Sequence, residues 1–276
     1  MLRPVRPADR ERVIEISADV WEGTDYLPDM FDAWASDPGA SFQAAEVDGI
    51  VVAVHRLRPI ARRVMFYEGL RVASSHRRRG IARAMLRQAM SEARSLGFEQ
   101  MRLYTGNPDA GRLFSSEGFH LLTDCGVWTS RRVEGGDPAR LAAPSEAPAL
   151  AERLYGDPAL AAYGGVNADW NGTLDVDASL LEQLAEQGRV RIGAGGRGIA
   201  LVRSGARSRL PITFLAGSGA ALQDLLMGLR FEADSLGMRG VAVLAPANHP
   251  AADDLGEVGY DLADDEGHAY IYALQL

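Results

Sequence analysis

An internal repeat constrains the fold of this chain more than any other sequence feature. Residues 91–97, SEARSLG, return 140 positions later as residues 231–237, FEADSLG. A short apolar segment follows each copy, and each is followed by an asparagine and a glycine 11 positions apart: Asn107 with Gly118, and Asn248 with Gly259. The offset shifts only from 140 to 141, which one inserted loop residue explains. Ordered repetition at one period predicts two related domains in tandem.

The domain boundaries follow from local composition. Residues 134–145 are rich in Gly, Pro and small side chains and lack apolar periodicity, which is typical of a linker. We therefore expect an N-terminal domain over residues 1–133, a linker over 134–145 and a C-terminal domain over 146–276. With 276 residues and 47% hydrophobic content, the chain is long enough to build two small cores.

Strand and helix patterns alternate in both halves, which predicts an α/β fold with a mixed sheet flanked by helices. In the first half we expect strands near 2–6, 42–47, 51–57, 64–72 and 101–104, and helices near 8–20, 29–34, 81–96 and 109–117. Asp48-Gly49 predicts a hairpin turn between two of these strands. In the second half we expect helices near 146–154, 178–187 and 219–236, and strands near 189–193, 198–203, 209–216, 240–245 and 268–275.

A basic loop, Arg77-Arg78-Arg79-Gly80-Ile81-Ala82, stands between an expected strand and an expected helix. The free N–H groups of a helix start, the positive end of the helix dipole and nearby arginines all favour an anion. Gly80 would let a ligand approach the backbone closely. The loop therefore predicts a site for a phosphorylated ligand, and the alternative is a solvated basic turn.

The spacing Arg77-x-x-Gly80-x-Ala82 resembles the pyrophosphate loop of the GCN5-related N-acetyltransferases. The expected order of strands and helices resembles the fold of that family across nearly all of residues 1–133. That resemblance implies acetyl-CoA as the acyl donor and no metal. It implies that Arg77 and the backbone of Arg78, Arg79, Gly80, Ile81 and Ala82 hold the pyrophosphate, and that Leu70, Arg71 and Val72 pair with the pantetheine arm. Asn107 would touch the same arm, or would cap a turn before Pro108.

One departure concerns the segment Ala110-x-x-Leu113-Phe114-x-x-x-Gly118-Phe119. Phe114 stands at a cofactor-contacting position where many relatives place the tyrosine that protonates the departing thiolate. Phenylalanine cannot donate a proton. Either solvent does so, or a hydroxyl of Tyr104, Ser115 or Ser116 substitutes, or the thiolate leaves unprotonated, because a thiol is only weakly basic.

Acetyl transfer to an amine needs a base for the ammonium and a donor for the thioester oxygen. Glu68 is the predicted base, and the N–H near Leu70 is the predicted donor. Strict alternation places Glu68 on one strand face with Phe66, Leu70 and Val72. The alternative is a structural glutamate paired with Arg71 or Arg102.

The acceptor is expected near residues 21–28, where acidic and aromatic side chains suit a cationic amine. The predicted acceptor residues are Trp21, Asp25, Tyr26 and Tyr104, although tryptophans such as Trp21 and Trp34 are more often core anchors than ligand contacts. Asp25-Tyr26-Leu27-Pro28, Trp34, Asp37-Pro38 and residues 68–72 are similar to the histidine N-acetyltransferase-like branch. That similarity implies a free amino acid or another small amine as acceptor.

The second half lacks the three consecutive arginines of the basic loop. An ungapped comparison at offset 140 places Gly217-Ser218-Gly219 near the basic loop and Ser208 opposite Glu68. We therefore expect a degenerate copy that shapes the fold, the substrate cleft or a homodimer contact.

Composition narrows the class of protein. A net charge of −8 argues against nucleic-acid binding. The single cysteine, Cys125, cannot form an internal disulfide, and the five histidines lack metal-ligand spacing. No long apolar run or secretory signal is evident, so we expect a cytoplasmic protein without a membrane partner. Two rival functions stay open: a non-catalytic acyl-CoA-binding sensor, and acetylation of protein N-termini or an aminoglycoside.

Overall fold

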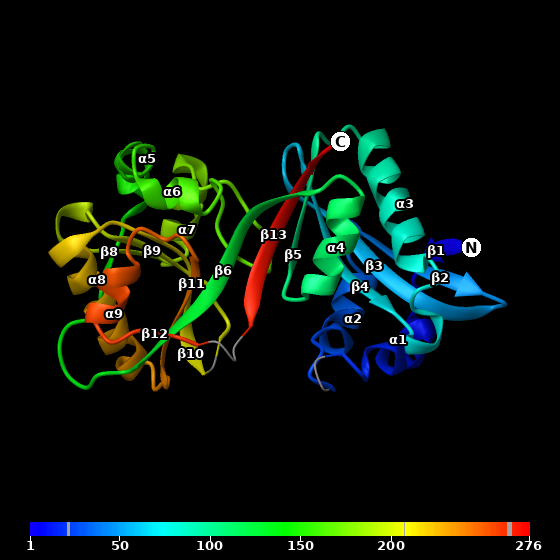
Figure 1. The fold of residues 1–276 in the computed structure, drawn as a ribbon, viewed down its shortest axis with the longest axis horizontal. Coiled ribbons are helices and arrows are strands. Elements are labelled where there is room, and N and C mark those ends of the chain that lie inside the picture. Colours follow the sequence, from blue (N-terminus) through cyan, green and yellow to red (C-terminus); the bar gives the residue numbers. More distant parts are fainter. Residues whose placement is uncertain (21–22, 207, 264–266) are drawn as a thin grey trace. The chain divides into compact units, whose positions relative to one another are not determined.

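A computed structural model describes residues 1–20, 23–206, 208–263 and 267–276, which form two compact units (Figure 1). Unit 1 comprises residues 1–103, 109–120 and 272–276, and unit 2 comprises residues 104–108 and 121–271. These units do not follow the ranges expected from the repeat. Strand β6 (His120–Arg131) lies mostly in unit 2 because it pairs with β11 (Gly240–Pro246), and strand β13 (His268–Gln275) ends in unit 1. The expected ranges stay a prediction about the sequence repeat.

Unit 1 is a mixed sheet with helices on both faces, as the alternating pattern predicts. Its strands follow the order β1-β2-β3-β4-β5, with the end of β13 beside β5. The pairs from β1 to β4 are antiparallel, whereas β4 and β5 are parallel. Its elements are β1 (Leu2–Pro4), α1 (Arg10–Ser17), α2 (Leu27–Ala35), β2 (Ser41–Val47), β3 (Ile50–Ala61), β4 (Val64–Val72), α3 (Ile81–Ser95), β5 (Gln100–Thr105) and α4 (Pro108–Ser116), with short 3-10 turns at Pro7–Asp9 and Ser74–His76.

Two apolar layers fix the helices of unit 1 to the sheet. On one face Val13, Leu27 and Phe31 from α1 and α2 pack with Phe42 and Val54. On the other face Met85 of α3 packs with residues that include Ala53, Leu70 and Val72. The Asp48-Gly49 turn is confirmed, with φ of 52° and 78° at its two residues, the left-handed values that a tight two-residue hairpin requires.

Unit 2 has a second mixed sheet. The first residues of β13 are followed by β6, β11, β10, β9, β8 and β7, with β12 also on β6. Strands β10 and β11 are parallel, as β4 and β5 are. Besides β6, β11 and β13, its elements are β7 (Arg140–Leu141), α5 (Ala147–Leu154), α6 (Pro158–Ala162), α7 (Ala178–Glu186), β8 (Val190–Ile192), β9 (Ile199–Val202), β10 (Arg209–Ala216), α8 (Gly219–Ser235), α9 (Ala252–Glu257) and β12 (Asp261–Leu262), with 3-10 turns at Pro144–Glu146 and Ala194–Gly196.

The sequence repeat is visible in the backbone. Helices α3 and α8 both end at a left-handed glycine, Gly97 with φ 82° and Gly237 with φ 66°. The next residue in each copy donates to a carbonyl five residues back: Phe98 to Ala93 at 3.1 Å, and Met238 to Ala233 at 2.8 Å. This is the Schellman closure of a helix, and it explains why both copies keep the same glycine.

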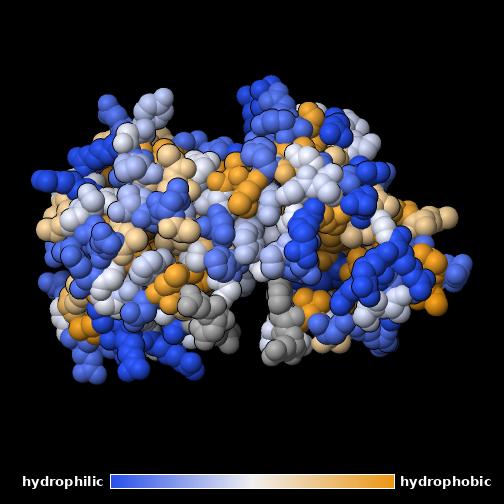
Figure 2. Space-filling view, viewed as in Figure 1, coloured by the Kyte–Doolittle hydropathy of each residue, from blue (hydrophilic) through white to orange (hydrophobic). Residues whose placement is uncertain are grey.

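Polar residues cover much of the face seen in Figure 2, and apolar residues form separate small patches there. Among the described residues, none of the helices combines the length and the apolar character needed to cross a bilayer.

Candidate functional site

Strands β4 and β5 pair over only part of their length. The parallel register runs from Val64 with Gln100 to Tyr67 with Leu103, and β4 then continues to Val72. Four of the five residues in this continuation, 68–72, are only half-buried. Its backbone therefore offers hydrogen-bonding groups that an extended amide-containing ligand can use.

Strand β4 has a bulge at Gly69, so its side chains do not alternate between the two sheet faces as expected. Arg56 of β3 opposes Glu68 and Val54 opposes Arg71, so two β4 residues face His55 alone. Glu68 and Arg71 consequently lie on the α1/α2 face, whereas Leu70 packs against α3. The expectation that Glu68 shares a face with Leu70 and Val72 is wrong, because one extra residue reverses the alternation of a strand.

Glu68 is held by two arginines of β3. Nη1 of Arg56 donates to Oε1 of Glu68 at 2.5 Å, and Nε of Arg58 donates to the same oxygen at 2.8 Å. Among the described residues no group donates to Oε2. The two arginines thus fix the orientation of the carboxylate through Oε1, which leaves Oε2 for a ligand.

Arg56 connects Glu68 to a second carboxylate. Its Nη2 donates to Oδ2 of Asp37, and its guanidinium lies 4.8 Å from the centre of the Trp34 ring. Arg56 is nearly fully buried, and its Nε finds no partner among the described residues. Sequence reasoning missed Arg56, Arg58 and Asp37 as neighbours of Glu68. The available signal was the alternation Arg56-Leu57-Arg58, which places two arginines on one face of the adjacent strand.

Asp25 and Tyr26 lie near Glu68 as well. Asp25 accepts two hydrogen bonds from Arg71, from Nε at 2.7 Å and from Nη2 at 2.9 Å. The Arg71 guanidinium also lies 5.5 Å from the Tyr26 ring centre, and burial raises the pKa of Tyr26. Because Arg71 already neutralises Asp25, this carboxylate fixes the position of Arg71 on β4. It is not an unpaired anion that would attract a cationic acceptor. Glu68 is paired with arginines, as the alternative interpretation expected, but these are Arg56 and Arg58, whereas Arg71 pairs with Asp25.

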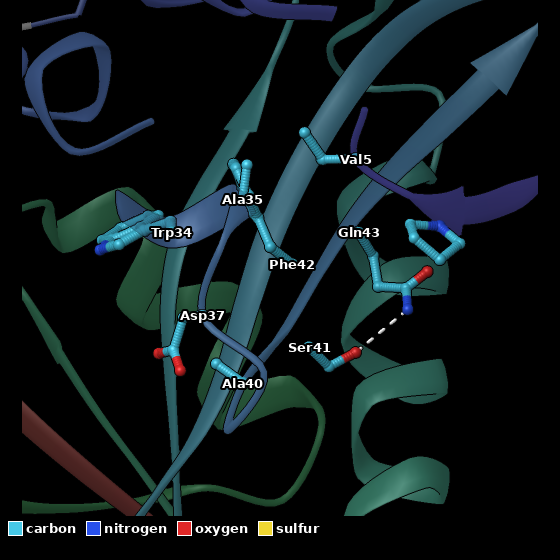
Figure 3. Close-up of a pocket in the computed structure, with 9 residues that line it drawn as sticks. Val5, Trp34, Ala35, Asp37, Ala40, Ser41, Phe42 and Gln43 are labelled. Carbon is cyan, nitrogen blue, oxygen red and sulfur yellow. Dashed lines mark hydrogen bonds between the residues drawn. The ribbon is translucent and has the colours of Figure 1, made fainter. Parts of the chain in front are cut away.

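Beside this cluster is a pocket of about 260 Å³. Figure 3 shows Trp34 and Asp37 on one side of it, and Gln43, whose amide donates to the Ser41 hydroxyl at 3.0 Å, on the other. The remaining lining residues are Pro4, Val5, Ala35, Ala40 and Phe42. Asp37 thus links the pocket to Glu68 through Arg56.

The basic loop has the backbone geometry of an anion cradle. Arg78 and Gly80 both take left-handed φ values, 59° and 81°, and Gly80 directly precedes α3. Arg77 is tied down by its contacts with Asp19 at 3.2 Å and with the Val72 carbonyl at 3.1 Å. Arg78 and Arg79 are exposed and form no ion pair with any described residue. These features fit a pyrophosphate, because N–H groups and free cations converge at one helix start.

The helix arginines that follow the loop have another role. Arg83 and Arg87 both bind Glu117 of the α4 region, at 2.8 Å and 2.7 Å. They join α3 to α4, whereas Arg78 and Arg79 are the exposed arginines without an ion pair to any described residue. The Ser116 hydroxyl accepts from Arg83 at 3.1 Å and donates to the Leu113 carbonyl at 2.7 Å, so it is already engaged.

Phe114 is a core residue of unit 1. Its ring packs within 6.3 Å of Tyr67, 5.8 Å of Phe119 and 6.1 Å of Tyr272, measured between ring centres. It is 4% exposed and brings no hydroxyl to α4.

The other predicted residues lie elsewhere. Tyr104 and Asn107 belong to unit 2; burial raises the pKa of Tyr104 to about 12, and the Asn107 N–H donates to the Thr105 hydroxyl at 3.1 Å. Trp21 lies outside the described residues. Within the described ranges no group of three His, Cys, Asp or Glu side chains is placed to hold a metal.

Part of the chain resembles a known family and known proteins. Residues 10–119 match the model of the acetyltransferase (GNAT) family. A histidine N-acetyltransferase of Oreochromis niloticus is 34% identical over 80 residues, which cover 29% of this chain and 24% of that protein. The chain therefore spans only about a quarter of the length of this relative.

Structural neighbours cover the whole chain. A GCN5-related N-acetyltransferase from Sphaerobacter thermophilus aligns over 100% of this chain and 95% of its own, with a TM-score of 0.63 and 14% identity. A tandem GNAT protein from the clavulanic acid biosynthesis pathway aligns over 100% and 98%, with a TM-score of 0.57 and 14% identity. At these identities the likeness shows the fold. Residues 10–119 are therefore similar to the acetyltransferase (GNAT) family, and the whole chain has the fold of solved GNAT proteins, one of which is a tandem GNAT protein.

Proposed function

We propose that unit 1 transfers the acetyl group of acetyl-CoA directly to the primary amine of a small molecule, such as a free amino acid. The observation that carries this proposal is the half-buried end of β4, which leads through the left-handed loop Arg78–Gly80 to the start of α3. A pantetheine arm would pair with residues 70–72, and the pyrophosphate would bind the N–H groups of residues 78–82 with Arg78 and Arg79.

Glu68 is the proposed base. Its Oε2 would take a proton from the acceptor ammonium, directly or through water, while Arg56 and Arg58 hold Oε1. The freed amine attacks the thioester carbonyl, the backbone N–H near Leu70 stabilises the negative oxygen, and the carbon–sulfur bond then breaks. Since Phe114 has no hydroxyl and Ser116 is engaged, solvent protonates the thiolate in this scheme.

The acceptor class follows from the charges beside β4. Asp25, Asp37 and Glu68 are matched by Arg56, Arg58 and Arg71, so the cluster is neutral overall. A neutral site with both signs suits a zwitterion, whose amine and carboxylate need opposite partners. The similarity to a histidine N-acetyltransferase of Oreochromis niloticus supports an amino acid as acceptor.

The Glu68 role is tested with Glu68→Gln. Thiol release from acetyl-CoA is measured over a panel of free amino acids, an N-terminal peptide and an aminoglycoside. We expect Glu68→Gln to lower kcat about 100-fold, with KM for acetyl-CoA within twofold, because one proton transfer is lost and the cofactor contacts remain. Glu99→Gln, at an exposed glutamate paired with Arg63, is the matched control. Equal rates in the two variants would remove Glu68 from the mechanism.

The cofactor site is tested with Gly80→Glu, which places negative charge at the proposed pyrophosphate. Calorimetry should show no acetyl-CoA binding. Gly97→Glu is the control, because Gly97 also has positive φ and open space at its Cβ but lies at the other end of α3. A second candidate function, an acyl-CoA sensor, is favoured by Phe114, and it predicts tight binding without turnover on any amine.

A further inference from the structure

Unit 2 keeps the strand geometry of the proposed cofactor site. Strands β10 and β11 pair in parallel from Arg209 with Gly240 to Ile212 with Val243, and β10 then continues to Ala216. A register shift at Thr213 occurs just where this pairing ends, as the β4 bulge follows Glu68. The continuation of β10 differs in one respect: all of its residues are buried.

A long connection covers this part of β10. In unit 1 residues 18–26 join α1 to α2, whereas in unit 2 the corresponding connection, residues 155–177, is more than twice as long and includes α6. Its Tyr163 is fully buried, with its ring centre 4.7 Å from that of Phe214. The Tyr163 hydroxyl donates to the Leu244 carbonyl of β11 at 2.5 Å. Tyr163 therefore contacts both strands beyond their pairing, β10 through its ring and β11 through its hydroxyl.

Two further groups bind the same edge of β10. The Ala168 N–H donates to the Thr213 carbonyl at 2.7 Å. Nε2 of His249 lies 2.9 Å from the Leu215 carbonyl, while its Nδ1 accepts from the Ala251 N–H at 3.1 Å. Since Nδ1 accepts, Nε2 carries the proton and donates. The carbonyls of alternate β10 residues are thus satisfied by this chain itself.

The start of helix α8 is occupied in the same way. Only Gly217 and Ser218 separate β10 from α8, whereas residues 73–80 separate β4 from α3. The Gly219 N–H donates to Oδ2 of Asp254 at 3.1 Å, and Gln223 donates to Oδ1 of the same carboxylate at 2.9 Å. A side-chain anion therefore binds the helix start, and a phosphate would meet its negative charge.

We infer that unit 2 fills its own copy of the acyl-CoA site, with Tyr163 and His249 between the strands and Asp254 at the helix start, so that the chain binds one acyl-CoA and not two. The count rests on the proposed function of unit 1. The closed state of unit 2, in which its own side chains occupy the strand edge and the helix start, rests on the hydrogen bonds of Tyr163, His249 and Asp254.

Calorimetry with acetyl-CoA tests the count. We expect one equivalent per wild-type chain and none in Gly80→Glu. Two equivalents in the wild type, with one kept in Gly80→Glu, would overturn this inference and leave unit 1 as a binding site. One equivalent in both proteins would place the only site in unit 2 and overturn both proposals. No binding in either protein would overturn the proposed function and the count of one.

Tyr163→Phe tests the closed state without acetyl-CoA. Loss of the hydroxyl leaves the carbonyl of the half-buried Leu244 on β11 without its partner, so we expect the midpoint of thermal unfolding to fall by about 2–6 °C. Tyr155→Phe is the control, because Tyr155 belongs to the same connection and is 89% exposed. Equal midpoints for the two variants would overturn the assignment of Tyr163 as the bridge between β10 and β11.

Discussion

At the scale of single residues, Gly69 determines which side chains meet on β4. Its φ is +66°, and a Cβ atom there would lie 2.6 Å from Cζ3 of Trp34. No other residue type meets both conditions, since side chains disfavour this φ and the indole fills the space. The position of Glu68 beside Arg56 and Arg58 thus depends on a residue that has no side chain of its own.

Gly69→Ala is therefore expected to lower the free energy of unfolding by about 2–4 kcal/mol, the sum of left-handed strain and overpacking. Urea denaturation measures this loss. Gly49→Ala isolates the strain, because Gly49 has a φ of +78° and nothing within 4 Å of its Cβ position; its expected loss is about 1 kcal/mol. Equal losses in the two variants would show that the Trp34 contact relaxes freely.

His55, which the Gly69 bulge faces, gives the fold a pH dependence. Its ring is fully buried, with Nδ1 3.3 Å from the Tyr67 hydroxyl, and burial lowers its pKa from 6.5 to about 4. Between these two values the unfolded chain binds a proton that the folded chain does not. Stability contributed by neutral His55 is therefore present above pH 6.5 and falls as the pH falls towards 4.

From pH 7 to pH 5.5 this group should remove about 1 kcal/mol from the free energy of unfolding. Urea denaturation at both pH values should show that His55→Gln loses this part of the pH dependence, whatever its absolute stability. His76→Gln, at a less buried histidine on the basic loop, should keep it. An unchanged slope in His55→Gln would mean that His55 takes up a proton in the folded state.

At the scale of elements, most of the fold could be predicted from the sequence. The strand over 64–72, the Asp48-Gly49 hairpin and the helix that starts after Gly80 all lie where periodicity and turn chemistry predict them. The bulge at Gly69 could not be predicted this way, because an extra strand residue leaves the apolar pattern nearly unchanged. The arginine partners of Glu68 depend on strand pairing, which single-strand patterns do not specify.

The comparison of the two halves shows a similar limit. Phe66 pairs with Arg102, and Pro211 pairs with Ala242, which lies 140 positions after Arg102. In this register Thr213, not Ser208, corresponds to Glu68. The ungapped offset fails here because unit 2 has only two residues between β10 and α8. Unit 2 therefore lacks the basic loop as a whole and not only its arginines.

At the scale of the whole molecule, each unit needs residues from distant parts of the chain. Residues 272–276 belong to unit 1, where Tyr272 packs on Phe114, Leu274 is largely buried, and the Leu276 N–H donates to the Glu99 carbonyl at 2.8 Å. A fragment of residues 1–133 would lack this strand.

Ending the chain at Ile271 should therefore weaken unit 1. We expect acetyl-CoA affinity to fall at least tenfold and the thermal unfolding midpoint to fall by several degrees, because three buried side chains and a strand segment are lost. Gln275→Ala, at an exposed position of the same strand, should leave both unchanged. Full affinity in the shortened chain would show that unit 1 does not need residues 272–276 to bind acetyl-CoA.

The same strand has a consequence for the order in which the protein forms during translation. Domains made first usually fold first as the ribosome elongates the chain. Here the half that carries the basic loop receives residues 272–276 after all of unit 2 has been synthesised. A ribosome that stalls within unit 2 releases a chain whose first half is still incomplete, so the half with the proposed cofactor site is completed last although it is encoded first.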